Sequence, residues 1–599
     1  MISSKYPSAY FSQKEVLGVL AVPATAILAN GCLVSVLKLA GADVLAYGLI
    51  IPLVLLAVGV MIRHLRHHAA LPDGRRLLVL LGFAAAASLA HLLVFGTAIN
   101  NDATLHAAHA FHAFFSSGTF SFSEAPFMTF GPQPTAKHWL PNNLEYAVTA
   151  VAWIFDLSFQ ELTWGVNFVY NLLYVAAFLS LVFIFMGAIP GMVLAAAFLV
   201  ALYAVIGNSE DIIGMGLFRG FENKGLIFGF YYWGVIALFL ASPKRPVAGP
   251  AAAVIVFAAS AVFVSANFPV LAVIAVAMAI GAVVAPPRRS VIMGTILIIL
   301  PLILAAAVYM ALPGGDVLAP PGMQMTAGGT AGALQVADIV TYPKKHWILA
   351  AVVVAWLFWF DRVLAAQLGI YLVIAVVSHT QWTYELASPF LGGYGRVIWR
   401  FLILFNPFVP IIVGGAALAG RLDQRVPLRL PVLALAAVAL GVFLRPPPSH
   451  PYKGAVRPVL PHVAETCQPG ASILTSRALG AVLPVIAPTF RIFVGKDQYL
   501  SWQIANLPSA SADRKRAEAV RDASQYLGSG GAAAEQAFLE VMARERPDIV
   551  IADTPLSARA EQAMAGYGKT VFQAPSPYVA GKVETFQIFS LPEICDKDR

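Results

Sequence analysis

The chain has 599 residues, of which 59% are hydrophobic and only 12% are charged. Soluble domains usually carry about a quarter of charged residues, so this composition excludes a soluble enzyme and indicates a membrane protein. The net charge of +8 forms no basic stripe interleaved with aromatic residues, which argues against nucleic acid as a partner. Residues 1–450 hold 39 of the charges and the last 149 residues hold 31. We therefore expect a polytopic α-helical membrane body, residues 1–444, followed by a soluble domain, residues 445–599.

About 13 apolar runs approach the length of roughly 20 residues that a spanning helix needs. They lie at 16–38, 43–62, 77–99, 163–186, 189–206, 225–242, 250–267, 270–285, 290–311, 346–360, 363–379, 398–419 and 430–444. A further apolar segment at 145–157 is too short to cross, and we interpret it as an interfacial or re-entrant helix. Residues 1–15 lack the pattern of a cleaved signal peptide, so the first run is expected to stay in the membrane.

Loops rich in Lys and Arg mark the cytoplasmic side of membrane proteins. Such loops follow alternate runs here, at Arg63–Arg76, Lys244–Arg245, Arg288–Arg289, Arg362 and Arg421–Arg429. This alternation predicts a multi-pass protein of the cell inner (plasma) membrane with a cytoplasmic N-terminus. It places the C-terminal domain on the outer side, together with the loops 100–162, 207–224, 312–345 and 380–397.

The last 155 residues alternate between strand-like and helix-like segments. Strands are expected at 472–476, 490–494, 549–552, 570–573 and 585–590, and helices at 514–526 and 535–546. This order predicts a small α/β domain with a partly parallel sheet. Cys467 and Cys595 bracket the domain and could form a disulfide outside the cytoplasm, although two unpaired thiols are equally compatible with the sequence.

The strongest candidate for chemistry opens the loop 100–162. Asp102 directly follows the third apolar run, and a helix there would place His106 one turn further, with His109 near the same face. A carboxylate at the membrane surface can accept a proton from a substrate hydroxyl, while the histidines could orient it, bind phosphate or hold a metal. The alternative is an Asp that caps a helix beside interfacial histidines.

Other outer loops supply candidate residues for binding a substrate or its phosphate. They are Glu210, Asp211, Arg219, Lys224, His379, Glu385, Tyr394, Arg396 and Arg400. The acids could contact a sugar, an acceptor or a divalent cation, and the arginines could hold a phosphate. The segment Asn142–Glu145 could line an acceptor groove. Solvated loop charges, snorkelling arginines and an aromatic belt are the alternatives.

This layout resembles the GT-C superfamily of integral membrane glycosyltransferases over roughly residues 77–599. The shared features are many spans, an acid just after an early span, a long first outer loop and an outer C-terminal domain. The resemblance implies an inverting transfer of a sugar from a polyprenyl-phosphate carrier to a hydroxyl of a glycan, lipid or protein acceptor among membrane lipids. It also implies that Asp102 is the catalytic base. Because Asn100 and Asn101 stand where the family often has a second acid, a Mg²⁺ or Mn²⁺ requirement stays open.

Two other classes of function remain alternatives: a transporter or flippase for a lipid-linked substrate, and a membrane assembly scaffold. Transporters more often contain internal repeats and ionisable residues deep within their spans. The chain has no clear repeat, and its acids are concentrated in the outer loops instead. A scaffold would be indifferent to substitution of Asp102 or Arg400.

Overall fold

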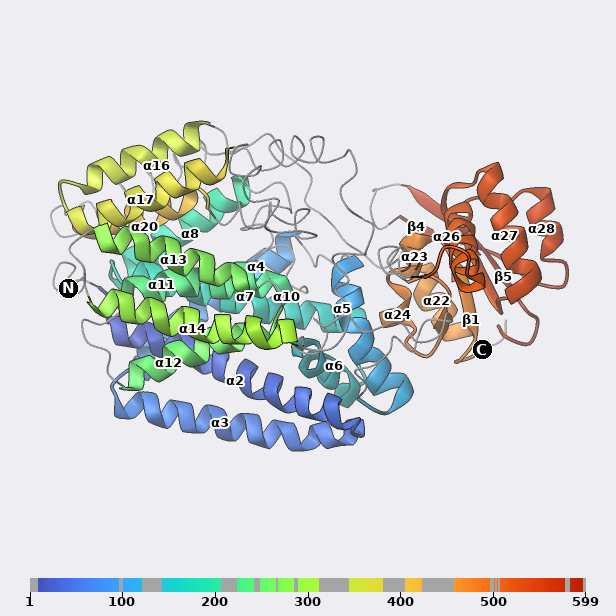
Figure 1. The fold of residues 1–599 in the computed structure, drawn as a ribbon, viewed down its shortest axis with the longest axis horizontal. Coiled ribbons are helices and arrows are strands. Elements are labelled where there is room, and N and C mark those ends of the chain that lie inside the picture. Colours follow the sequence, from blue (N-terminus) through green and yellow to red (C-terminus); the bar gives the residue numbers. More distant parts are fainter. Residues whose placement is uncertain are drawn as a thin grey trace.

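The computed structural model is mostly helical and ends in a small sheet (Figure 1). It describes residues 9–95, 101–120, 143–205, 223–241, 248–265, 268–284, 289–311, 344–380, 405–422, 457–495, 500, 504, 507–576 and 582–595. Long helices pack side by side in a helical body, and the C-terminal domain lies at one end of this body, at the right of Figure 1.

The helices of the body coincide with the first twelve predicted apolar runs, and the thirteenth run, 430–444, lies outside the described residues. They are α2 (Gln13–Ala40), α3 (Tyr47–His67), α4 (Gly74–Phe95), α7 (Phe159–Phe183), α8 (Ala188–Val205), α10 (Asn223–Leu226) with η4 (Ile227–Tyr231) and α11 (Tyr232–Ala241), α12 (Ala248–Ser260) with η5 (Ala261–Phe263), α13 (Pro269–Val284), α14 (Arg289–Ala311), α16 (Lys344–Leu357), α17 (Arg362–Ser378) and α20 (Phe408–Leu422). The last of these begins at Phe408, where the side chain of Asn406 accepts hydrogen bonds from the amides of Phe408 and Val409 and so caps the helix. Residues 398–404 of its apolar run lie outside the described part of the structure.

Among the described helices, four are long and apolar enough to cross a membrane: Lys14–Ala40, Val44–His67, Gly74–Leu93 and Glu161–Phe183. The surface of α3 supports this assignment, since Leu49, Leu55 and Leu56 are each more than 60% exposed. Large apolar surfaces of this kind are rare on soluble monomers and are stable against lipid. The chain is therefore a helical protein of membrane type, and the number of thirteen spans stays a prediction.

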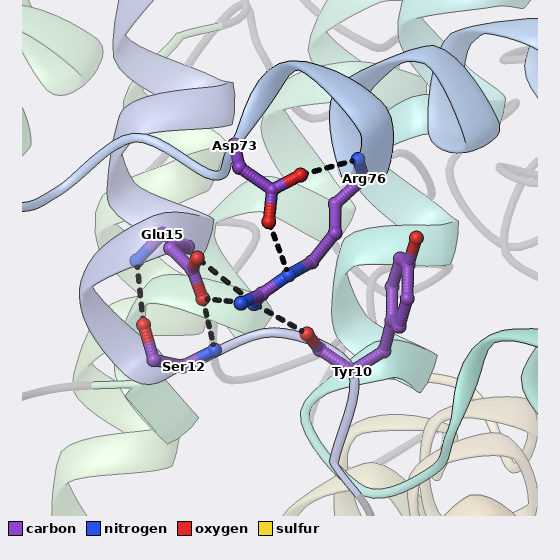
Figure 2. Close-up of polar contacts among 5 residues, drawn as sticks. All are labelled: Tyr10, Ser12, Glu15, Asp73 and Arg76. Atoms are coloured by element: carbon purple, nitrogen blue, oxygen red, sulfur yellow. Dashed lines mark hydrogen bonds and ion pairs between the residues drawn. The ribbon is translucent and has the colours of Figure 1, made fainter.

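A polar cluster joins the starts of α2 and α4 (Figure 2). Ser12 and Glu15 form a reciprocal capping box at the start of α2. The guanidinium of Arg76 donates to Glu15 at 3.0 Å, to Asp73 at 2.9 Å and to the carbonyl of Tyr10 at 3.1 Å. This network fixes the two helix starts at one end of the body, the end that the charge pattern predicts to be cytoplasmic.

The C-terminal domain contains a five-stranded sheet of order β2-β1-β3-β5-β4. Its strands are β1 (Ser472–Thr475), β2 (Arg491–Ile492), β3 (Ile549–Ala552), β4 (Gly568–Pro575) and β5 (Val583–Ser590). The first three are parallel neighbours, and β5 runs antiparallel to both β3 and β4. All four residues of β3 are buried, as in a strand covered on both faces. The predicted small α/β domain with a partly parallel sheet is confirmed, although β2 is shorter than expected.

Helices of this domain pack against the sheet. They are α22 (Val459–Thr466), α23 (Arg477–Gly480), α24 (Leu483–Ile486), α26 (Ala512–Ser529), α27 (Ala532–Glu545) and α28 (Ala558–Ala563). A disulfide joins Cys467, at the end of α22, to Cys595, near the end of the chain. The sequence left this pairing open, because it does not supply the distance between the two residues, which is 4.0 Å between their Cα atoms.

Candidate functional site

The helix that carries the predicted base is present as α5 (Asn101–His112). Asp102 is the second residue of this helix, and His106 and His109 follow at helical spacing. The side chains of Asp102 and His106 lie outside the described part of the structure. The backbone position alone places Asp102 in the first helical turn, where the dipole of a helix favours the ionised form of a carboxylate.

One side of α5 packs against the helical body. Ala107, Ala108 and Phe111 are at most 3% exposed and belong to the main apolar core. The ring of Phe111 meets Phe159, the first residue of α7, edge to face with 5.5 Å between the ring centres. The small residues on this face of α5 therefore allow a close approach between the helix and the body.

The C-terminal domain contacts α5 as well. Its short helix α24 lies against α5, and Leu483 and Val485 belong to the same apolar core as Phe111 (Figure 1). A ring nitrogen of His112 is hydrogen-bonded to the carbonyl oxygen of Pro488, and burial lowers the pKa of His112 below its usual value. The helix with Asp102 is thus held between the membrane-type body and the soluble domain.

A second polar group lies next to α5, at the start of α6 (Leu144–Phe155), the helix predicted to be interfacial. The ammonium of Lys38, near the end of α2, donates to the side-chain oxygen of Asn143 at 2.6 Å. It also lies 4.2 Å from the centre of the Tyr146 ring, and Glu145 is near enough to act on it electrostatically. Lys38 and Glu145 are at most 5% exposed, so two ionisable side chains of opposite type are buried near each other.

Hydrogen bonds extend this group across three helices. The amide group of Asn30, on α2, donates to the backbone carbonyl of Asn143, and the hydroxyl of Tyr47, on α3, donates to the side-chain oxygen of Asn30 at 2.7 Å. Asn143 in turn donates to the carbonyl of Gly31 at 2.7 Å. The network fixes α6 against α2 and α3. The sequence suggested the segment Asn142–Glu145 as a groove lining, but it gave no indication of Lys38 as its partner.

Sequence reasoning also missed a row of buried polar residues on α7. Thr163, Asn167 and Asn171 follow one another at intervals of four residues and are at most 3% exposed. The signal was present in the sequence as amides at helical spacing inside the apolar run 163–186. The mean hydropathy of the run does not reveal such a row, because it averages over residues on all faces of the helix.

The remaining candidates are distributed as follows. His379 ends α17, where its ring nitrogen Nδ1 lies 2.8 Å from the carbonyl oxygen of Ala375 and its ring packs on Trp347. Lys224 belongs to α10, but its side chain lies outside the described part. Seven further candidates lie outside the described residues altogether: Glu210, Asp211, Arg219, Glu385, Tyr394, Arg396 and Arg400.

Within the described residues, no group of three or more His, Cys, Asp or Glu side chains is arranged to hold a metal ion. No protein-family model and no curated protein sequence matches the chain.

Proposed function

We propose that the chain is a membrane glycosyltransferase of the GT-C type. It moves a sugar from a polyprenyl-phosphate carrier to a hydroxyl of a glycan, lipid or protein acceptor at the outer face of the plasma membrane. The observation that supports this proposal is the position of α5 between the apolar body and the soluble domain. A reaction between a lipid-borne donor and a polar acceptor needs its base at such a boundary.

In this mechanism, Asp102 takes the proton of the acceptor hydroxyl, whose oxygen attacks the anomeric carbon of the sugar. The bond from that carbon to the phosphate oxygen breaks, and the polyprenyl phosphate leaves with the electron pair. A single displacement of this kind inverts the anomeric centre. Arg219, Arg396 and Arg400 are proposed to hold the phosphate, and a divalent cation, if one is used, would be held by oxygen ligands such as Glu210 and Asp211.

The substitution Asp102→Asn tests this function. We expect it to lower the rate of transfer from a radiolabelled polyprenyl-phosphate sugar by about 100-fold or more, because an amide cannot accept the proton. Transfer is measured with purified full-length protein, and the melting temperature of the variant is measured in parallel.

Asp156→Asn is a matched control. Asp156 ends α6 in a left-handed conformation with φ of 50°, which asparagine adopts readily. Its variant should retain full transfer. Full activity of Asp102→Asn would remove Asp102 from the role of base, and transfer only from soluble nucleotide sugars would refute the proposed donor. Passage of an intact lipid-linked sugar across vesicles without transfer would favour the transporter alternative.

A further inference from the structure

The buried row on α7 has an unusual position for polar side chains. In the first half of this helix, Thr163, Asn167 and Asn171 are at most 3% exposed, whereas Val169, on the opposite side of the helix, is 47% exposed. Further along, the buried residues are mostly apolar, with Phe178 packed edge to face on Trp233 at 5.2 Å between ring centres, and the buried Ser180 is hydrogen-bonded within the helix. The polar row is therefore confined to the half of α7 that begins next to α5.

The amides of this row lack hydrogen bonds. Within the described structure, Nδ2 of Asn167 and both Nδ2 and Oδ1 of Asn171 are buried without a partner. By contrast, the hydroxyl of Ser180 on the same helix donates to the carbonyl of Ala176 at 2.7 Å. Buried amides without partners are costly, especially in a bundle of membrane type, and buried polar groups in proteins are otherwise almost always paired. Asn167 and Asn171 thus have hydrogen-bonding capacity that the described chain does not use.

The surroundings connect the row to the candidate site. Phe159, at the start of α7, packs on Phe111 of α5. The hydroxyl of Tyr170, which lies between the two asparagines in sequence, is within electrostatic reach of Glu145 and of Tyr231. Tyr231 in turn shares a hydrogen bond of 2.7 Å with Ser260. The half of α7 that carries the two asparagines therefore lies near further hydroxyls and the buried carboxylate of Glu145.

We propose that the buried face of α7 from Thr163 to Asn171 binds the hydroxyl groups of the neutral sugar of the donor, an inference that rests on the proposed function. A carboxamide offers both a donor and an acceptor without charge, which matches the two capacities of a sugar hydroxyl. A phosphate would require cationic partners, and a lipid tail would leave the amides without hydrogen bonds. In this arrangement, the arginines bind the phosphate of the carrier, and the buried face of α7 binds the sugar.

A comparison of two buried asparagines provides the first test. Asn171 is 1% exposed and has no partner in the described structure, whereas Asn30 is 6% exposed and is hydrogen-bonded to Asn143 and Tyr47. We expect Asn171→Leu to leave the melting temperature of the ligand-free full-length protein unchanged or raised, and Asn30→Leu to lower it. A fall for Asn171→Leu as large as that for Asn30→Leu would show that the amide has a structural partner, and would overturn the inference.

The second test compares two probes, a polyprenyl-phosphate sugar and the same polyprenyl phosphate without its sugar. We expect the wild-type protein to bind the sugar-bearing carrier about tenfold more tightly, or better, as measured by thermal shift titration. Asn167→Leu and Asn171→Leu should bind both carriers with the affinity that the wild type has for the sugar-free one. The control Ser180→Ala should keep the wild-type preference.

The outcomes separate the two proposals. If Asp102→Asn abolishes transfer but Asn171→Leu retains the preference for the sugar-bearing carrier, the row is filled by water or left empty, and only this inference fails. If the wild type binds both carriers equally, the sugar assignment of α7 fails while the donor assignment stands. If it binds neither carrier, both proposals fail.

Discussion

Individual side chains near α5 take their chemistry from partners that are distant in the sequence. Lys38 and Asn143 are separated by 105 residues, yet their side chains meet at 2.6 Å. A buried lysine is stable only when its ammonium is hydrogen-bonded or paired, and here Asn143 and the Tyr146 ring serve this purpose. His112 also has a partner that is remote in the sequence, because its ring is hydrogen-bonded to the carbonyl oxygen of Pro488 in the C-terminal domain.

The packing of the C-terminal domain on α5 should depend on pH through His112. Burial lowers the pKa of His112 from its usual value of 6.5, and the bond to Pro488 opposes this only in part. The folded-state pKa therefore lies below the unfolded-state value, so the stability is fully present above about pH 6.5 and is lost as the pH falls through the folded pKa. After correction for the intrinsic chemical rate, the amides of α24 should be less protected from hydrogen exchange at about pH 5 than at about pH 7.5.

His112→Gln is the matched variant for this measurement, since glutamine keeps a hydrogen-bond donor but does not titrate near neutral pH. Its α24 should exchange with little dependence on pH once the intrinsic chemical rate is taken into account. Equal protection of the wild type at both pH values would contradict a role of His112 in the packing.

At the scale of elements, hydropathy and charge were sufficient to locate most helices. The long helices of the body coincide with the first twelve predicted apolar runs, and β1, β3 and β5 lie within two residues of their predicted positions. These elements are visible in the sequence because each depends on a local pattern of apolar residues. The polar face of α7 was missed for the same reason, since whether an amide is paired depends on the neighbouring helices.

The junction between α2 and α4 should contribute measurably to the stability of the body. Arg76→Ala removes the bonds to Glu15, Asp73 and the Tyr10 carbonyl, and we expect a loss of about 1 kcal/mol because the Arg76 side chain is 38% exposed. Chemical unfolding of the protein in detergent measures this loss of stability. Arg75→Ala is the control, since Arg75 is its exposed neighbour and should be neutral. Similar losses in both variants would mean that the cluster in Figure 2 adds nothing specific.

At the scale of the whole molecule, one apolar core runs from the helical body through α5 into the C-terminal domain. Residues of α7, α5 and α24 belong to it together, as do Val463 of α22 and Cys467, which follows that helix. The soluble domain is therefore packed on the body rather than tethered only by its linker. A change in the stability of this domain should therefore also change the stability of α5, the helix that carries Asp102.

Loss of the disulfide tests that connection. Cys467→Ser opens the bond that closes a loop of 128 residues, and we expect a loss of about 2–5 kcal/mol in the stability of the C-terminal domain. Hydrogen exchange should then increase both in the sheet and in α5. Cys32→Ser, at the exposed free cysteine, is the control and should leave both unchanged. A weakened sheet with unaltered exchange in α5 would show that the two parts are energetically independent.

The sequence by itself determined the membrane-type composition, the positions of the apolar helices and the strands of a soluble C-terminal domain. These features follow from sums over neighbouring residues, which a linear pattern contains in full. Only the tertiary structure decided that α24 lies on α5, that Lys38 meets Asn143, and that the amide of Asn30 is paired while that of Asn171 has no partner among the described residues. Hydrogen bonds and packing need atoms within a few ångströms, and residues far apart in the chain reach that distance only when the whole fold brings them together.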